Sequence, residues 1–151
     1  MNETDSPEPD GFVWNDRYLL GYAPMDATHR EFVRLVDALL TVDDMELMDA
    51  LQAFAVHAVT HFAEESCWMA ENDFPAKDCH VAEHDKVLAS VHEVREMLAR
   101  GNVEVVRQLA VALLEWFPAH ADYMDSALAT WMTKRSHAGV PLVFKRQKPL
   151  E

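Results

Sequence analysis

Residues 57–84 read HAVTHFAEESCWMAENDFPAKDCHVAEH, and this stretch decides the fold that we predict for the 151-residue chain. It contains two helix-like runs separated by a turn. On an α-helix, residues four apart lie within about 40° of each other, so His61 and Glu65 share one face, as do His80 and His84. Burying imidazoles and carboxylates costs free energy unless they are paired, and a metal ion pairs with several at once. The stretch therefore predicts a metal site inside a helical bundle.

Composition narrows the class of protein. Half of the residues are apolar and only four are glycine, which favours one helical domain. The formal net charge of −13 argues against a nucleic-acid partner, because phosphates need a basic surface. The first residues, MNETDSPEPD, lack the apolar centre of a signal peptide, and no apolar run reaches the ~18 residues of a membrane span. We expect a cytoplasmic protein without membrane insertion, whose Cys67 and Cys79 are free, buried thiols.

Apolar residues recur at helical spacing in four segments, joined by short connections. Asp26 or Thr28 is the expected N-cap of the first segment, with Glu31 completing a capping box. Pro118 should kink the last segment just before His120. The expected helices are residues 26–40, 44–71, the run from the Pro75 turn to Gly101, and 103–132. The pattern predicts an all-α, antiparallel up-down four-helix bundle.

The two ends of the chain differ from this central part. Residues 1–11 predict a disordered acidic tail, because prolines and acids cannot form a core. An extended arm laid over the bundle should follow, and the bundle domain should span residues 12–132. Residues 133–151 contain five of the 13 basic residues and a single acid. This basic C-terminal tail is a candidate contact for a protein partner or an anionic surface.

The other helices add further ligands to those of the central stretch. The full candidate set is His29, His61, Glu65, His80, His84, His120 and Asp125. Five imidazoles and two carboxylates exceed the needs of one zinc ion and suit two iron-sized ions bridged by carboxylates. Helix geometry supports one pair of ligands poorly. His120 and Asp125 are about 140° apart on an ideal helix, so they would not face the same site. Geometry alone does not favour Asp125 over Asp122.

In its set of candidate ligands, the chain resembles the hemerythrin-like family, specifically its single-domain bacterial members. The resemblance covers residues 12–132 and rests on FVWNDRYLLGYAPMDATH, on HFAEE followed by Met69 and Pro75, on H-x3-H and on the late H-x4-D. It implies that one iron is bound by His80, His84 and His120 and the other by His29 and His61. Glu65 and Asp125 would bridge the two irons together with a solvent-derived oxo or hydroxo group.

The resemblance also implies a function. The first iron would have six ligands and the second five, which leaves one position where dioxygen binds reversibly while the irons cycle between Fe2+ and Fe3+. We therefore expect an oxygen carrier, store or supply protein rather than an enzyme, as a monomer or weak oligomer. The residues expected to line a dry oxygen pocket are Phe32, Phe62, Val87, Trp116, Phe117 and Ala121. Because Ala121 is smaller than the branched residue we expect there, the pocket should be more open and autoxidation faster.

Three alternatives stay open at this point. The same diiron site could act on nitric oxide, peroxide or iron, or sense oxygen, although no signalling domain is fused to it. HVAEH at residues 80–84 fits a zinc hydrolase motif with Glu83 as the base, but that leaves His29 and His61 unexplained. A ferritin-like diiron oxidase would need E-x-x-H pairs, which the sequence lacks.

Several polar residues near the ligands have a plainer interpretation. A single inward histidine is more often a hydrogen-bonded core residue than a metal ligand, and only the full set reverses this expectation. We interpret His57 as a polar neighbour of the site rather than a ligand. Glu64, Glu83 and Asp122 are expected to be solvated neighbours of the ligands.

Overall fold

The computed structural model describes residues 11–136, and this range forms helices without any strand. The long helices are α1 (Ala23–Thr41), α2 (Leu47–Glu71), α3 (Lys77–Ala99) and α4 (Glu104–His120), and α5 (Ser126–Ser136) continues α4. Most of the predicted acidic and basic tails lies outside the described residues. However, residues 133–136 belong to α5, so the last helix extends beyond the predicted end at residue 132.

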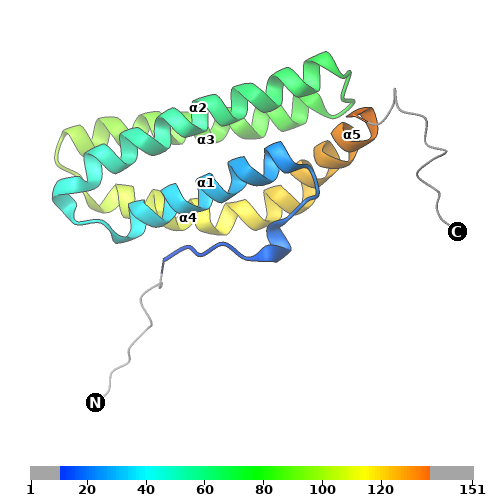
Figure 1. Cartoon of the computed structure of the whole chain (residues 1–151). Helices are drawn as coiled ribbons and strands as arrows, with labels where there is room; N and C mark the ends of the chain where they lie inside the picture. Colours follow the sequence, from blue (N-terminus) through cyan, green and yellow to red (C-terminus); the bar gives the residue numbers. More distant parts are fainter. Residues whose placement is uncertain (1–10, 137–151) are drawn as a thin grey trace, which may run out of the picture.

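The four long helices form an antiparallel bundle (Figure 1). α1 packs against α2 and α4, and α3 packs against the same two helices. Short connections join successive helices, including the three-residue 3-10 turn η2 (Asp44–Glu46) before α2. The prediction of an all-α four-helix bundle is confirmed. None of the described helices is long and apolar enough to cross a membrane.

The core consists of two apolar clusters with a polar layer between them. The smaller cluster contains Met25, Met69, Phe74, Leu128, Ala129 and Met132. The larger cluster includes Phe32, Phe62, Val87 and Phe117, together with Phe12 of the N-terminal arm and further apolar residues of the four long helices. Along α1, along α2 and from η3 (Ala121–Asp125) into α5, a buried histidine or acid stands between a residue of one cluster and a residue of the other, as His29 does between Met25 and Phe32. The helices therefore place their polar residues in one layer.

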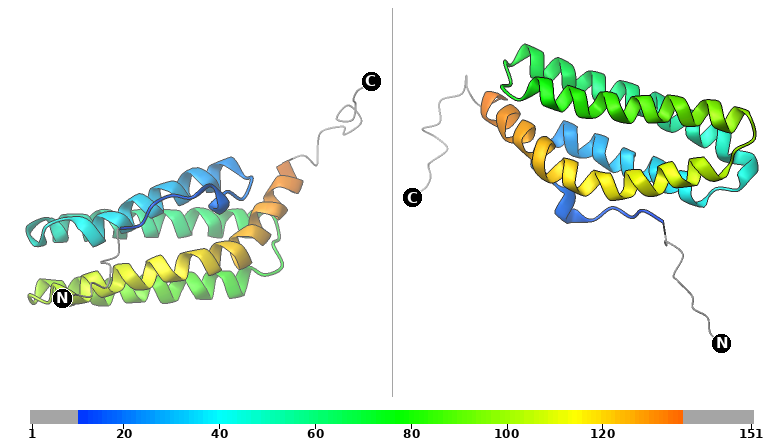
Figure 2. Two further views of the ribbon diagram at one scale, coloured as in Figure 1. Left: turned by 90° about the horizontal axis from the view of Figure 1, so that it is seen from below. Right: turned by 180° about the vertical axis from the view of Figure 1, so that it is seen from behind.

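The N-terminal arm, residues 11–22, runs along the bundle beside α1 and α4 (Figures 1 and 2). Phe12 is buried, and its ring meets Phe117 edge-on with centroids 6.0 Å apart. The backbone N–H of Phe12 donates to Asp37 at 3.0 Å. Gly11 has φ +88°, a conformation that favours glycine, and a Cβ there would displace the Asp37 carboxylate that accepts this hydrogen bond. The predicted arm over the bundle is confirmed, and it covers the larger apolar cluster.

The start of α1 differs from the prediction. The helix begins at Ala23 with Pro24 in its first turn, and neither Asp26 nor Thr28 is the N-cap. Instead the Asp26 carboxylate accepts hydrogen bonds from the backbone N–H groups of Leu20, at 2.8 Å, and Gly21, at 3.1 Å. The Thr28 hydroxyl donates to the Pro24 carbonyl. Proline suits a first helical turn because its missing N–H would be unpaired there. Asp26 therefore ties the arm to the helix.

The last predicted helix is interrupted. The chain stays helical through Pro118, and it then widens into the π-helical segment η3 (Ala121–Asp125) before α5. Figures 1 and 2 show that the helix changes direction as α4 passes through η3 into α5, whereas we expected a kink before His120.

The expectation that both cysteines are buried is wrong. Cys67 and Cys79 are free, as predicted, but exposed.

Asp26→Ala should destabilise the fold through loss of the arm contact. Hydrogen bonds to a charged acceptor contribute about 1.5–3 kcal/mol each, so we expect the free energy of unfolding to fall by about 2 kcal/mol. Urea unfolding measures this change. Asp26→Asn keeps one carbonyl acceptor and should lose about half as much. Equal stability of the alanine variant and the parent protein would refute a structural role for these two bonds.

Candidate metal centre

The seven predicted ligands meet in the polar layer of the bundle. His29 comes from α1, His61 and Glu65 from α2, and the remaining four from α3, the end of α4 and η3. Each is at most 5% exposed. Donor atoms lie within 4.8 Å of one another in two groups, which are His80, His84, His120 and Asp125, and His29, His61 and Glu65. The folded chain thus brings together residues that are up to 96 positions apart in the sequence.

The two oxygens of Glu65 face different groups of histidines. Its Oε1 lies 3.3 Å from Nε2 of His80 and 3.4 Å from Nε2 of His84. Its Oε2 lies 2.9 Å from Nε2 of His61 and 3.8 Å from Nε2 of His29. One carboxylate therefore connects a histidine group on α3 with a histidine group on α1 and α2.

Asp125 divides its oxygens in the same way. Its Oδ1 lies 3.0 Å from Nε2 of His80 and 3.2 Å from Nε2 of His120, while its Oδ2 lies 3.1 Å from Nε2 of His29. All five histidines thus direct Nε2 toward the carboxylates. The cluster has two centres, one beside His80, His84 and His120 and the other beside His29 and His61, with two carboxylates shared between them.

The donor set fits metal ions better than hydrogen bonds. Ligands bound at about 2.1 Å in octahedral geometry are about 3 Å apart, which is close to most of these donor separations. Of the histidine–carboxylate contacts, that of His61 with Glu65 has hydrogen-bond geometry. In the described part of the chain, every buried side-chain N or O atom without a hydrogen-bond partner belongs to this cluster. Such atoms are costly to bury, and metal coordination would compensate for them.

The π-helical segment explains why Asp125 joins His120. An ideal α-helix would turn these residues about 140° apart. The i→i+5 pattern of a π-helix brings residues five apart onto the same side, and η3 ends at Asp125. Asp122 is exposed, in agreement with its interpretation as a solvated neighbour. The late H-x4-D spacing therefore requires the widened turn that sequence geometry alone could not anticipate.

The charges of the metal-free cluster stabilise one another. Burial lowers the pKa of His29 and His80, but contacts with Asp125 and Glu65 outweigh it and raise both pKa values to about 9. Burial raises the pKa of Glu65 and Asp125, yet the surrounding imidazoles hold both pKa values well below the usual range. His84 behaves differently, since burial lowers its pKa to about 3. Its ring is stacked on Phe62, with centroids 3.8 Å apart.

Two residues outside the predicted set contact the histidine rings. His57 Nε2 lies 3.2 Å from Nδ1 of His61, which agrees with its interpretation as a polar neighbour. Glu83 is not a freely solvated side chain, because its Oε1 accepts from the Trp116 indole N–H at 3.0 Å and lies 3.8 Å from Nδ1 of His120. Sequence reasoning missed this contact, because the three residues come from two helices and the HVAEH motif places Glu83 beside neither Trp116 nor His120.

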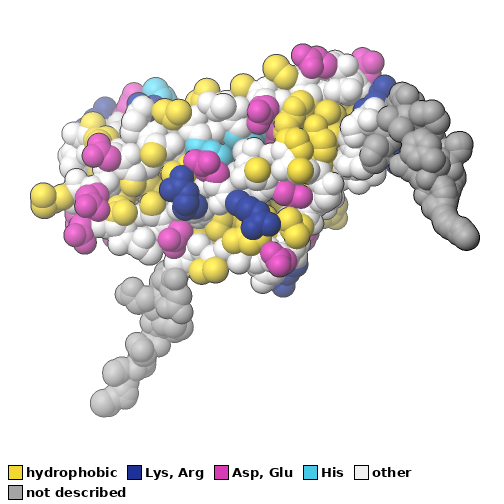
Figure 3. Space-filling view, in the orientation of Figure 1, with side chains coloured by type: hydrophobic (Ala, Val, Ile, Leu, Met, Phe, Trp, Pro, Cys, Tyr) yellow, Lys and Arg dark blue, Asp and Glu magenta, His cyan; other side chains and the backbone are white. Residues whose placement is uncertain are grey.

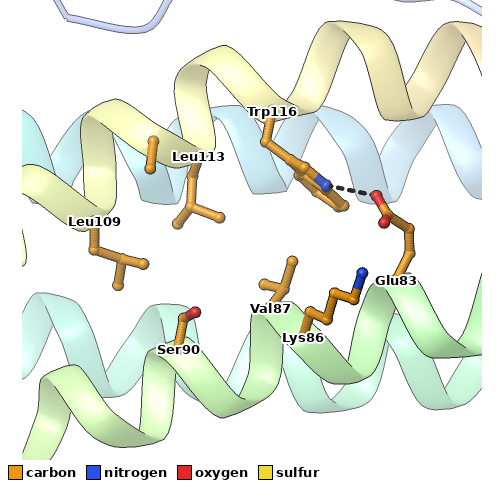
Figure 4. A pocket seen from close by; sticks show the side chains of 8 residues that line it. Glu83, Lys86, Val87, Ser90, Leu109, Leu113 and Trp116 are labelled. Atoms are coloured by element: carbon orange, nitrogen blue, oxygen red, sulfur yellow. Dashed lines mark hydrogen bonds between the residues drawn. The ribbon is translucent and has the colours of Figure 1, made fainter.

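The predicted pocket residues surround the cluster from several sides. Phe32 and Phe117 stack on each other, and Phe117 meets His29 edge-on. Trp116 stacks on His120 with centroids 4.3 Å apart. Val87 and Trp116 line a groove of about 250 Å³ between α3 and α4 (Figure 4). Ala121 is 1% exposed within the larger apolar cluster, and an open pocket there stays a prediction.

A second hollow brings solvent close to the two-histidine centre. It has a volume of about 220 Å³ and lies between α1 and α2, where His57 and His61 form part of its wall. Glu31 and Glu64 make this hollow acidic. Figure 3 shows histidine surface beside an acidic side chain in this region, where α1 and α2 meet. The two centres therefore differ in their surroundings as well as in their number of histidines.

Comparisons with known proteins agree with this geometry. The family model described as the hemerythrin HHE cation binding domain matches residues 20–132. A bacteriohemerythrin of Ralstonia nicotianae is 42% identical over 122 residues, which are 81% of this chain and 89% of that protein. A bacteriohemerythrin of Aquifex aeolicus is 33% identical over 111 residues, which are 70% of this chain and 85% of that protein.

Solved structures are similar in fold. Crystal structures of two hemerythrin variants superpose with a TM-score of 0.73 at 21% identity. The match covers 80% of this chain and 95% of each of those chains. At this level of identity the likeness concerns the fold alone. The family match, the sequence relatives and the buried histidine and carboxylate cluster support a metal centre in the polar layer.

The metal-free protein should be most stable near pH 6.5. Above this ordinary histidine pKa, folded His29 and His80 keep protons that the unfolded chain loses, so stability falls toward pH 9. Below pH 6.5, His57 and His84 gain protons in the unfolded chain, whereas in the folded protein they accept protons only near pH 4 and pH 3. Stability therefore falls on that side too.

Urea unfolding of chelator-treated protein between pH 4 and 9 measures this profile. His57→Gln should flatten the acid side, and the exposed His92→Gln should leave the profile unchanged. A midpoint that rises steadily from pH 5 to pH 8 would contradict the predicted maximum.

Asp125→Asn should lower metal occupancy, because it removes an anionic oxygen from one or both centres. Asp122→Asn is the matched control, since it changes an exposed aspartate in the same π-helical segment. We expect the control to bind as much iron as the parent protein and Asp125→Asn to bind less than two irons per chain. Metal analysis after reconstitution measures both, and full occupancy of Asp125→Asn would show that this ligand assignment is wrong.

Proposed function

Because this chain belongs to the hemerythrin family, we propose that it binds dioxygen reversibly at a carboxylate-bridged pair of iron ions. The observation that carries the proposal is the division of each carboxylate between two histidine groups. Glu65 presents one oxygen to His80 and His84 and the other to His61, and Asp125 divides its oxygens in the same sense. This is the arrangement that two bridged ions need.

The ligand roles follow from this division. We assign His80, His84 and His120 to one iron and His29 and His61 to the other. Glu65 and Asp125 bridge the two, together with a solvent-derived oxo or hydroxo group. When bound, the iron pair supplies the electrons for reversible oxygen binding, cycling between Fe2+ and Fe3+. The centre with two histidines has one ligand fewer and is the proposed place for dioxygen.

The protein's own contribution is to keep the centre dry and its ligands fixed. Phe32, Phe62 and Phe117 pack against the ligand rings, with Phe62 parallel to His84 and Phe117 perpendicular to His29. Water is thereby excluded from most of the cluster, which protects bound oxygen from protonation and loss. The arm reinforces this wall, because Phe12 and Tyr18 both meet Phe117 edge-on.

The hollow between α1 and α2 supports the choice of the two-histidine centre. His61, a proposed ligand of that centre, forms part of the wall of this hollow. The centre that lacks one ligand is therefore also beside a recess that is open to the surface. His57 lies between the recess and the centre, in contact with Nδ1 of His61.

Redox chemistry or sensing at the same iron pair is the alternative use. It would act on nitric oxide, peroxide or iron, and it needs the same seven ligands. The zinc hydrolase alternative finds less support, because Glu83 faces Nδ1 of His120 and not the side of the rings where the Nε2 atoms meet. We propose a non-enzymatic, cytoplasmic monomer or weak oligomer. Contact of the basic tail with a protein or anionic surface also stays a proposal.

The visible spectrum tests the proposed function. The iron-loaded protein is reduced without oxygen, exposed to oxygen and then stripped of it. We expect a charge-transfer band that appears with oxygen and vanishes when oxygen is removed, over repeated cycles. Direct and irreversible conversion to the diferric form would contradict reversible binding and favour the redox or iron-handling alternative. The exposed-residue variant Asp122→Asn should cycle like the parent protein.

A further inference from the structure

His120 has an unusual environment among the proposed ligands. Its Nε2 faces Asp125 at 3.2 Å, so its Nδ1 points away from the metal centre. This Nδ1 is buried and, among the described residues, has no hydrogen-bond partner, as is also the case for Nδ1 of His29, His80 and His84. An imidazole that binds a metal through Nε2 carries its proton on Nδ1, and such a proton almost always has an acceptor. An acceptor for His120 is therefore required once the centre is loaded.

Glu83 is placed to be this acceptor. Its Oε1 lies 3.8 Å from Nδ1 of His120, and a shift of about 1 Å would bring the pair to the ~2.8 Å of a charge-assisted hydrogen bond. The Glu83 side chain is 31% exposed, so it keeps partial access to water while reaching the buried ring. In the described part of the chain, the ion-pair contacts of His29, His80 and His84 with carboxylates are all made through Nε2, so His120 alone of these four has a carboxylate near its Nδ1.

Trp116 holds both partners in place. Its indole N–H donates to Oε1 of Glu83 at 3.0 Å, as Figure 4 shows. The same indole stacks on the His120 ring with an interplanar angle of 22°. One aromatic side chain thus restricts the carboxylate on one side and the imidazole plane on the other. Val87 and Leu113 make the groove beside them mostly apolar, which strengthens a charge-assisted bond, although the charged Lys86 also lines this groove (Figure 4).

We propose that Glu83, held by Trp116, is a positioning residue. Its carboxylate accepts a hydrogen bond from the Nδ1–H group of His120 and thereby fixes this histidine for metal binding. The inference rests on the proposed function, because it takes His120 to be an iron ligand. The carboxylate selects the tautomer with a free Nε2, sets the orientation of the ring and makes the imidazole a stronger electron-pair donor to the metal. The negative charge of Glu83 also stabilises the more oxidised irons, so removing this charge should raise the reduction potential.

Iron affinity and reduction potential test the proposal in the full-length, iron-loaded protein. Loss of such an outer partner typically weakens metal binding about 10- to 100-fold, and we expect this loss in Glu83→Ala. Glu83→Gln keeps an acceptor without the charge, so it should retain most of the affinity while its reduction potential rises. Trp116→Phe keeps a stacking ring but removes the indole donor, and its affinity should lie between those of Glu83→Ala and the parent.

Glu93→Gln is the matched control. Glu93 lies on the same helix α3 as Glu83, but it is exposed and lies beyond the ligands of that helix. The substitution should leave both affinity and potential unchanged. If Glu83→Ala binds iron as tightly as Glu93→Gln, or if Glu83→Gln has the parent potential, the inference is wrong. If Glu83→Ala fails to fold, the potential of Glu83→Gln decides the question alone.

A zinc-loaded sample separates the inference from the proposed function. Zinc is diamagnetic, so the Nδ1–H proton of His120 can be observed by NMR without iron or oxygen. We expect this resonance at low field in the parent protein and shifted upfield or lost in Glu83→Ala. The same resonance in both proteins would overturn the inference. A parent iron protein that never binds oxygen reversibly would contradict the proposed function and leave this NMR result intact.

Discussion

The fold depends on the burial of seven ionisable side chains that face one another across the bundle and that bound metal would compensate. Five imidazoles and two carboxylates occupy a dry layer across the bundle, and they come from every long helix. An uncompensated group in this layer would cost several kcal/mol, which is a large fraction of the stability of a typical domain. The helices must therefore keep their relative register, and the apolar clusters on both sides of the layer hold that register.

Sequence reasoning succeeded where the chemistry repeats at a helical period. His61 with Glu65 and His80 with His84 are four apart, so their shared faces follow from helix geometry alone. The role of Asp125 was harder to predict, because only the family resemblance favoured this residue over Asp122. The π-helical segment that brings Asp125 inward has no simple sequence signal. Asp26 was assigned to a helix cap, although it holds the arm, because a local motif cannot reveal a contact with an irregular segment.

The two halves of the centre are built differently, although the same carboxylates join them. On the two-histidine side, the outer neighbour is His57, a neutral ring beside an acidic hollow. On the three-histidine side, the outer neighbours are Glu83 and Trp116 in an apolar groove. These neighbours lie on helices that the ligand spacing already fixes. Sequence patterns located the centre and predicted His57 as a polar neighbour, but they missed the contacts of Glu83 and Trp116 with His120.

The π-helical segment η3 also limits how the length of the chain can vary during evolution. It accommodates one more residue per turn than an α-helix between His120 and α5. Deleting a residue here would rotate α5 by about 100°, and Leu128 and Met132 would leave the smaller apolar cluster. A deletion that preserved those contacts would move Asp125 away from the histidines instead. Insertions and deletions should therefore accumulate in the connections between helices and be absent from η3.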